Sequence, residues 1–479
     1  MGTTVQAVPT SQLRVGFGRA DTTPPVGIYH RMWGAARHDR ASGVHRPLVG
    51  DVLAFGALAG SGVELIRAYL DGVGLAQREH DDLVRILAEA GGVSTDRVVV
   101  SYSHTHSGGV FYPDRIPLPG GKLIPAYLAQ LGERLATACR QAVATLQPVV
   151  ISYATGRCDL AANRDNWDEA FNGHVCGFNP DAPADDTVVV ARLTDAAGKL
   201  FATLVNYACH PTTLAWDNSL ISPDYVGAMR DVVETASSAP CIFAQGASGD
   251  LGPRHGFVGD TAIADKNGRQ LGYAALSALQ TLEPPLADFQ YSGPVISGAT
   301  IGVWANVPFD ATRQAATSHF SGGSYLVELP LKPRPEPAAL RTEIAQWEAR
   351  QKDADARGDA IAARDFGARA ERARRWLGRL AALPAGPTFP FPYWVYRLGD
   401  AVWVTTGGEP YNLLQTSLRQ RFPERTIVVS PLAGAGAAAY LLPRDRYGKG
   451  LYQEEPSSLA PGCLEMLIET IGERIADLG

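Results

Sequence analysis

Short apolar runs alternate with amphipathic segments along most of the chain, and this alternation limits the folds that the chain can adopt. Leu48–Leu58 and Val63–Leu70 are apolar enough for neighbouring buried strands, and Leu200–Ala208 repeats the pattern further on. Between them, Glu79–Ala90 and Ile124–Leu146 place their apolar residues on one helical face. Strands and helices that alternate in this way predict an α/β fold, with a mixed sheet covered by helices.

The composition changes after Pro333, where residues 336–383 become rich in Ala, Arg and Glu. Two stretches there repeat apolar residues at helical spacing, and Gly358 separates them. We therefore expect a helical hairpin over residues 334–384, inserted into a single large domain that occupies residues 1–479. The heptads are too few and too irregular for a coiled coil with a partner chain.

Charge and composition argue against several classes of protein. The net charge of -6 argues against a nucleic-acid binder, because phosphate binding needs a basic surface. No apolar run approaches about 20 residues, so we expect no membrane-spanning helix. Met1–Gln12 lacks a basic stretch followed by an apolar one, so we expect no secretion signal. The six cysteines are scattered without a C-x-x-C pair, which indicates free thiols and a cytoplasmic protein.

The stretch Ser101–Gly109 is the first candidate for chemistry. It follows the apolar run Arg97–Val100, which is typical of a buried strand. In an extended backbone alternate side chains share a face, so His104 and His106 would project into one pocket. A lone buried histidine is more often structural, but two imidazoles at a strand end, followed by two glycines, favour a metal site.

Two further strand ends carry candidate metal ligands. His210 follows the strand Leu200–Ala208, and ligands gather outside the carboxyl ends of strands in α/β sheets. Glu409 follows the predicted strand Ala401–Thr406. Each has a simpler interpretation, because His210 can cap a strand end and Glu409 can favour the start of the helix Tyr411–Arg421. Together with the first histidines, however, they supply the N and O ligands that a zinc hydrolase needs.

The glycine-rich loop Gln245–Arg254 matches neither of two common catalytic loops. It lacks the G-x-x-x-x-G-K-[ST] pattern of a phosphate-binding loop. Asp250 stands where a G-x-S-x-G nucleophile elbow needs its second glycine. The loop therefore predicts a tight turn with one carboxylate and backbone donors.

The ordered motifs of the chain resemble those of the neutral ceramidase family, which are zinc-dependent amidases that split ceramide into sphingosine and a fatty acid. Ser103-His104-Thr105-His106-Ser107-Gly108 is the most recognisable of these motifs. The others follow in the order of the family: Val15–Pro24, Asn163-Arg164, Asn206–His210, Leu220–Ser222, Phe243–Gln245, Gly408-Glu409 and Tyr440–Tyr452. The resemblance covers most of the chain.

This resemblance implies functional roles that spacing alone does not give. It implies that Zn2+ is held by His104, His210, Glu409 and Tyr440. It also implies that His106, Arg164 and Tyr452 surround the scissile carbonyl. Zinc lowers the pKa of a bound water to about 7, which provides hydroxide at neutral pH. Arg164 and Tyr452 would then donate hydrogen bonds to the oxyanion, and His106 would pass a proton to the leaving group.

Two features depart from the family pattern. Gly252 occupies the position of the catalytic serine of the family, so we expect zinc-activated water to attack directly, with Asp250 or His255 assisting. Arg254 joins Gly252 and His255 as a candidate substrate contact. After Tyr452 there is no room for the C-terminal immunoglobulin-like domain of the family, which argues against ceramide and for a more polar substrate.

We therefore expect a zinc-dependent hydrolase with a neutral ceramidase-like catalytic domain, which cleaves the amide (N-acyl) bond of a small soluble substrate. The same site acting on an ester, a lactone or another polar conjugate is the nearer alternative. A non-catalytic metal- or ligand-binding homologue is the alternative from a different class, and Gly252 would then mark lost chemistry. The sequence allows a homo-oligomer and does not require one.

Overall fold

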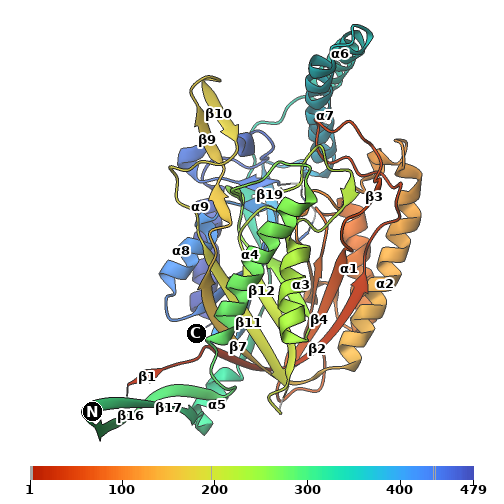
Figure 1. Ribbon diagram of the computed structural model, residues 1–479. Coiled ribbons are helices and arrows are strands. Elements are labelled where there is room, and N and C mark those ends of the chain that lie inside the picture. Colours follow the sequence, from red (N-terminus) through yellow and green to blue (C-terminus); the bar gives the residue numbers. More distant parts are fainter. Residues whose placement is uncertain (1–3, 196, 435, 437, 479) are drawn as a thin grey trace.

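The computed structural model describes residues 4–195, 197–434, 436 and 438–478. Within them, an eight-stranded sheet forms the centre, and only the outermost pair of strands at each edge is parallel (Figure 1). In sheet order its strands are β14 (Cys241–Gln245), β12 (Leu200–Tyr207), β11 (Thr187–Asp195), β7 (Gln147–Arg157), β2 (Thr10–Asp21), β4 (Val49–Ala57), β5 (Leu65–Leu70) and β6 (Val98–Tyr102). The predicted mixed α/β sheet is confirmed.

Helices cover one face of this sheet. They are α1 (Gln77–Gly91), α2 (Ile124–Ala144), α3 (Tyr225–Ser237) and α4 (Thr261–Gln280). Two glycines of β2 let α2 approach the sheet closely. A Cβ atom on Gly16 or Gly18 would lie 1.8 or 2.0 Å from a carbonyl oxygen of α2. Only glycine fits where this helix and strand touch.

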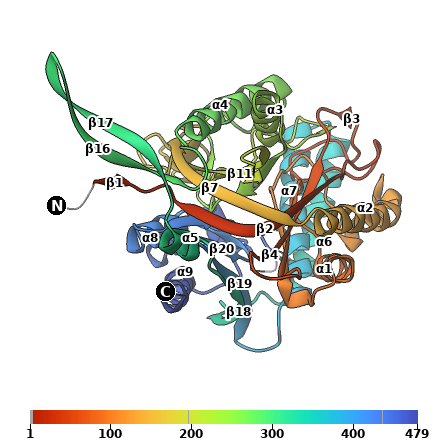
Figure 2. The ribbon, with the colours of Figure 1, turned by 90° about the horizontal axis from the view of Figure 1, so that it is seen from below.

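A second sheet, of four strands, packs on the opposite face of the large sheet (Figure 2). Its order is β18 (Phe320–Pro330), β19 (Thr388–Leu398), β20 (Ala401–Thr406) and β22 (Thr426–Val429). Trp403 of β20 is buried between the sheets, with its ring centroid 5.7 Å from that of Phe55 on β4. Helices α8 (Leu413–Arg421) and α9 (Cys463–Asp477) cover the outer face of the second sheet, so the body has four layers.

Sheet twist accounts for the meeting of distant strand ends. Neighbouring strands are rotated by about 20–25°, so the rotation between β12 and β6 accumulates to more than about 100°. The edge strands β6 and β14 consequently contact each other. The loops that follow β6 and β12 are thereby brought together, and they carry His104 and His210.

Short strand pairs organise the connecting loops. The pairs are β3 (Gly43–Val44) with β13 (Leu220–Ile221), β8 (Ala161–Asn163) with β15 (Leu251–Pro253), β9 (Asp165–Asp168) with β10 (Gly173–Cys176), and β21 (Glu409–Pro410) with β23 (Tyr440–Leu441). The region 159–186 therefore contains three short strands. The last pair sets Glu409 directly beside Tyr440.

A long β-hairpin extends away from the layered body (Figure 2). It consists of β16 (Ala287–Ser297) and β17 (Ala299–Pro308), with β1 (Val5–Gln6) as a third strand and α5 (Ala311–Thr317) after it. The sequence pattern does not predict this hairpin, because β17 is exposed along its whole length and has no buried face. Among the described helices, none has the length and hydropathy of a membrane span.

The predicted pair of helices is present as α6 (Pro337–Ala356) and α7 (Ala360–Ala382), which pack against each other at one end of the body (Figure 1). Gly358 lies between them with φ 73°, a conformation that glycine adopts without strain. Glu371 of α7 anchors the pair, because it accepts bonds of 3.0 and 2.7 Å from Arg115 and one of 3.0 Å from Arg375.

The Glu371 anchor should make stability pH-dependent in acid. Burial alone would raise the pKa of this carboxyl, but the hydrogen bonds and charges of Arg115 and Arg375 outweigh it and lower the pKa from 4.5 to about 2. A carboxyl with a depressed folded-state pKa stabilises the fold above pH 4.5 and loses this contribution as the pH falls toward 2. We expect about 3 kcal/mol to be lost over this range, measured by urea unfolding. Glu371→Gln should flatten that part of the profile, and an unchanged slope in the variant would contradict the assignment.

Candidate metal site

His104 lies in the loop after β6, in a backbone conformation that few residues adopt. Its φ is 69°, and its backbone N–H donates to the carbonyl oxygen of Gly72 at 2.8 Å. A positive φ in a residue with a side chain is uncommon and marks stored strain. The sequence argument that strand alternation pairs His104 with His106 is therefore wrong, because the strand ends at Tyr102. The two imidazoles come together through the loop instead.

Backbone carbonyls fix the tautomers of two histidines. Nδ1 of His104 lies 3.1 Å from the carbonyl oxygen of Val73, and Nδ1 of His210 lies 2.7 Å from that of Ser248. A carbonyl oxygen only accepts, so each Nδ1 must carry the hydrogen. Burial, Arg164 and His104 lower the pKa of His210 to about 4, so this ring is neutral at neutral pH. Its Nε2 then presents a bare lone pair.

Glu409 brings a carboxylate to these two histidines. Its Oε2 lies 3.3 Å from Nε2 of His104 and 3.1 Å from Nε2 of His210. Burial alone would raise the pKa of Glu409, but the two histidines lower it well below its usual value. Acceptor atoms this close repel each other unless a proton or a metal ion lies between them. Ligands on a tetrahedral zinc ion with bonds of 2.0–2.1 Å stand about 3.3 Å apart, so the donor set fits zinc.

The short strand pair β21–β23 and the link between β8 and β9 supply further polar groups. Glu409 of β21 pairs with Tyr440 of β23, and the Tyr440 hydroxyl lies 3.5 Å from Nε2 of His210. Arg164 is buried beside them, donating to the Tyr440 hydroxyl at 3.0 Å and to the carbonyl oxygen of Gly249 at 2.7 Å. The four residues that the family resemblance implies as ligands therefore gather in one place, together with Arg164.

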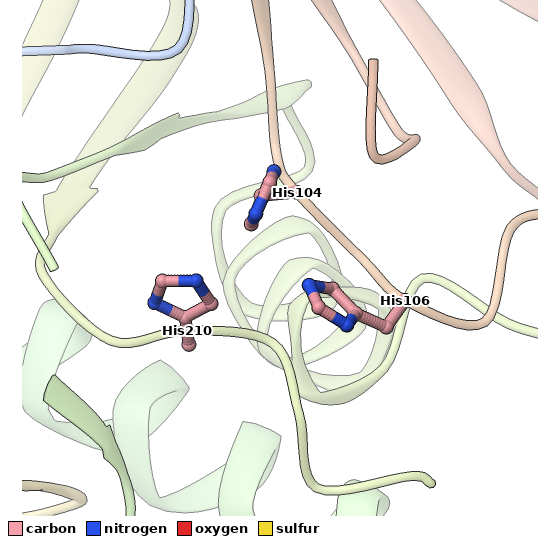
Figure 3. Close-up of side chains that lie close together, drawn as sticks. All are labelled: His104, His106 and His210. Carbon is pink, nitrogen blue, oxygen red and sulfur yellow. The ribbon is translucent and has the colours of Figure 1, made fainter. Parts of the chain in front are cut away.

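His106 joins the other two imidazoles to form a three-histidine cluster (Figure 3). Ligand atoms of His104, His106 and His210 all lie within 4.8 Å of one another, so this cluster could also hold a metal ion. Nε2 of His106 is buried and has no hydrogen-bond partner among the described residues. Burial and the other two histidines lower the pKa of His106 well below its usual value. A buried polar atom without a partner indicates a ligand of some kind at this point.

The remaining predicted residues differ in exposure and in their partners. Tyr452 is 49% exposed, and its ring meets that of Tyr440 edge-on at 5.9 Å. Asp250 turns to the start of α8, where it accepts from the backbone N–H of Asn412 at 2.7 Å, and burial raises its pKa to about 6. Arg254 and His255 are exposed, and Arg254 pairs with Asp159 at 3.0 Å. Roles for these side chains in catalysis or substrate binding stay predictions.

An aromatic wall beside His106 is missing from the sequence prediction. The ring of Trp33 lies 5.1 Å from that of His106, 6.1 Å from Trp216 and 5.7 Å from Phe257. Nε1 of Trp33 is buried, and no described residue accepts its hydrogen. The sequence does contain one indication of this wall. Trp33 stands in a segment without helical or strand periodicity, and a tryptophan there needs a buried neighbour. The wall gives the site an apolar side.

Gly252 lies on β15 next to Arg164, where a larger side chain fits. A Cβ atom there would meet the Arg164 side chain and the Thr212 hydroxyl at 3.7 Å, which is ordinary contact. We expect Gly252→Ser to change the free energy of unfolding by less than about 1 kcal/mol. At Gly249 a Cβ atom would lie 2.6 Å from the carbonyl oxygen of Glu409, so Gly249→Ser should destabilise by about 1–3 kcal/mol and weaken metal binding. Urea unfolding of both variants tests this contrast, and equal effects would contradict it.

Comparisons with known proteins agree with the sequence motifs and the fold. No family model matches the sequence. The chain is 27% identical over 259 residues to the neutral ceramidase of Pseudomonas aeruginosa, in an alignment that covers 50% of this chain and 37% of that protein. A solved ceramidase complexed with C2 has a TM-score of 0.64 at 17% identity, over 97% of this chain and 74% of that one.

A solved neutral ceramidase from Pseudomonas aeruginosa gives almost the same result. Its TM-score is 0.63 at 17% identity, over 98% of this chain and 75% of that one. The chain is therefore a homologue of neutral ceramidase with the same mixed α/β fold, which confirms the resemblance in the motifs. The sequence alignment spans well under half of the length of that relative.

Proposed function

We propose that this protein is a zinc-dependent hydrolase that cleaves the amide (N-acyl) bond of a small soluble substrate. One observation carries the proposal: the Nε2 atoms of His104 and His210 lie 3.3 and 3.1 Å from the carboxylate of Glu409. With the Tyr440 hydroxyl beside them, these atoms make up the N and O donor set of a catalytic zinc site. The similarity to neutral ceramidases supports hydrolysis as the type of reaction.

The residues around the donor set are suited to amide hydrolysis. Bound zinc supplies a water of lowered pKa and a Lewis acid for the substrate carbonyl. Arg164 is held through Nε and Nη2, which leaves its Nη1 hydrogens for the oxyanion. The unpartnered Nε2 of His106 is available to exchange a proton with the leaving nitrogen. Trp33 and its aromatic neighbours exclude water from the His106 side.

The full chain, purified without added metal, provides the test. We expect about one zinc per chain by elemental analysis, and release of the free amine from an N-acyl substrate such as N-octanoylglycine. His106→Gln and Arg164→Gln should keep the metal and lose at least about 100-fold in kcat/KM. A chain without stoichiometric zinc, or a His106→Gln variant with full turnover, would refute the proposal.

Two other outcomes would identify the alternatives. If octanoyl esters or lactones are cleaved with a higher kcat/KM than the matched amides, the site acts on those bonds. Gly252 gives a specific reason to consider the second alternative, a non-catalytic homologue, because it offers no nucleophile beside Arg164. Stoichiometric zinc with no turnover of any amide, ester or lactone would favour that function.

A further inference from the structure

Two side-chain hydrogen bonds hold helix α7 beside the metal site. On one side, Arg375 donates to the carbonyl oxygen of Met32, the residue before Trp33 of the aromatic wall. On the other side, Nε1 of Trp376 donates to Glu455 at 2.9 Å, in the segment that carries Tyr452. The base of the inserted hairpin therefore forms one side of the site rather than a separate surface feature.

Arg379 lies one helical turn after Arg375, so the two side chains share a face of α7. It forms no ion pair and no hydrogen bond with the residues that the structure describes, and its guanidinium rests against the Trp376 ring at 5.5 Å. Burial lowers the pKa of Arg379, and the charges of Tyr452, Glu455 and Glu409 only partly offset this. Arg379 thus lies against Trp376, whose Nε1 binds Glu455 at the end of the segment that carries Tyr452.

The neighbouring charges leave this arginine without a counter-ion. Glu371 already binds Arg115 and Arg375, and it lies 3.6 Å from a third arginine, Arg374. Glu455 accepts from Trp376. A partly buried guanidinium without a counter-ion among the described residues is available to bind an anion from outside.

We propose that Arg379 is the anion-binding residue of the substrate pocket, so that substrates of this protein carry a carboxylate, sulfonate or phosphate close to the scissile bond. The inference rests on the proposed hydrolase function and names the substrate class of the same site. Arg375 adds positive charge but is held by Glu371 and Met32, so Arg379 makes the direct contact. The aromatic wall around Trp33 accommodates the apolar part of the same molecule.

Binding of a matched pair of uncleavable ligands tests the anion site separately from turnover. The probes are 4-oxoundecanoic acid, which carries CH2 in place of the amide nitrogen of N-octanoylglycine, and its neutral carboxamide. Calorimetric titration of the zinc-loaded full chain should show about 10- to 100-fold tighter binding of the acid. Arg379→Gln should abolish this preference, and Arg379→Lys should restore part of it. Arg364→Gln, an exposed arginine of the same helix paired with Asp365, should leave it intact.

A second pair of probes covers the other side of the scissile bond. N-Octylsuccinamic acid and its neutral amide, titrated into the zinc-loaded His106→Gln variant to suppress cleavage, place the anion in the acyl part instead of the amine part. Equal binding of acid and amide in both pairs, or a preference that survives Arg379→Gln, would overturn the inference. Selective binding without cleavage of N-octanoylglycine would instead refute the amidase proposal and retain the anion site. Equal cleavage of N-octanoylglycine and N-octanoylglycinamide would refute the anion site and retain the amidase proposal.

Discussion

Replacing Glu409 by Gln should eliminate zinc binding and leave the metal-free protein at least as stable as the wild type. In the wild type, Nε2 of the neutral His210 faces a carboxylate oxygen of Glu409 at 3.1 Å, so the empty site is electrostatically unfavourable. The Gln amide has the same shape, and its N–H can donate to an imidazole Nε2. We expect the metal-free variant to gain up to about 1 kcal/mol. Zinc affinity should fall by at least about 100-fold.

Calorimetry with and without zinc measures both parts of this prediction. At zinc concentrations of about 1,000 times the Kd, the wild type should gain about 4 kcal/mol on adding the metal, and Glu409→Gln should gain almost nothing. Glu424→Gln, an exposed glutamate in the turn before β22, serves as the matched control and should behave as the wild type. If zinc stabilises Glu409→Gln as much as the wild type, the metal sits among His104, His106 and His210 instead.

Apolar patterns located the parts of the site that follow buried strands. His104 and His210 each come after a run apolar enough to be a strand, and those strands are β6 and β12. The meeting of their loops depends on accumulated sheet twist, which no local pattern encodes. Tyr440 was reachable only through the family resemblance, because its place beside Glu409 is set by one short parallel pairing.

The features that sequence reasoning missed lack a buried periodic face or a local partner. The β16–β17 hairpin is exposed, so its residues show no in–out alternation. Arg379 belongs to a helix that was predicted correctly, but one arginine among many on that helix carries no signal of its own. Its significance comes from the absence of a described partner and from its place against Trp376, which binds Glu455 beside the segment of Tyr452, and only the assembled fold provides this placement.

Trp403→Ala should be the most destabilising single substitution considered for this protein. Trp403 is 1% exposed between the two sheets, its Nε1 donates to the Tyr153 hydroxyl at 3.2 Å, and the Arg67 guanidinium lies over its ring at 5.2 Å. Truncation leaves a large cavity and removes the ring that faces a buried cation. We expect the free energy of unfolding to fall by at least about 4 kcal/mol in urea titrations.

The same substitution should also weaken the metal site, since β20 leads through two glycines to Glu409. Trp403 packs β20 against the large sheet, and the loops after two strands of that sheet carry His104 and His210. Losing this packing would let the Glu409 carboxylate move away from the two histidines. We expect zinc affinity to fall by at least about tenfold in the folded variant. Trp304→Ala, on the exposed β16–β17 hairpin, is the matched control and should cost no more than about 1 kcal/mol with unchanged zinc affinity. A Trp403→Ala protein that binds zinc as tightly as the wild type would show that packing between the sheets does not position Glu409.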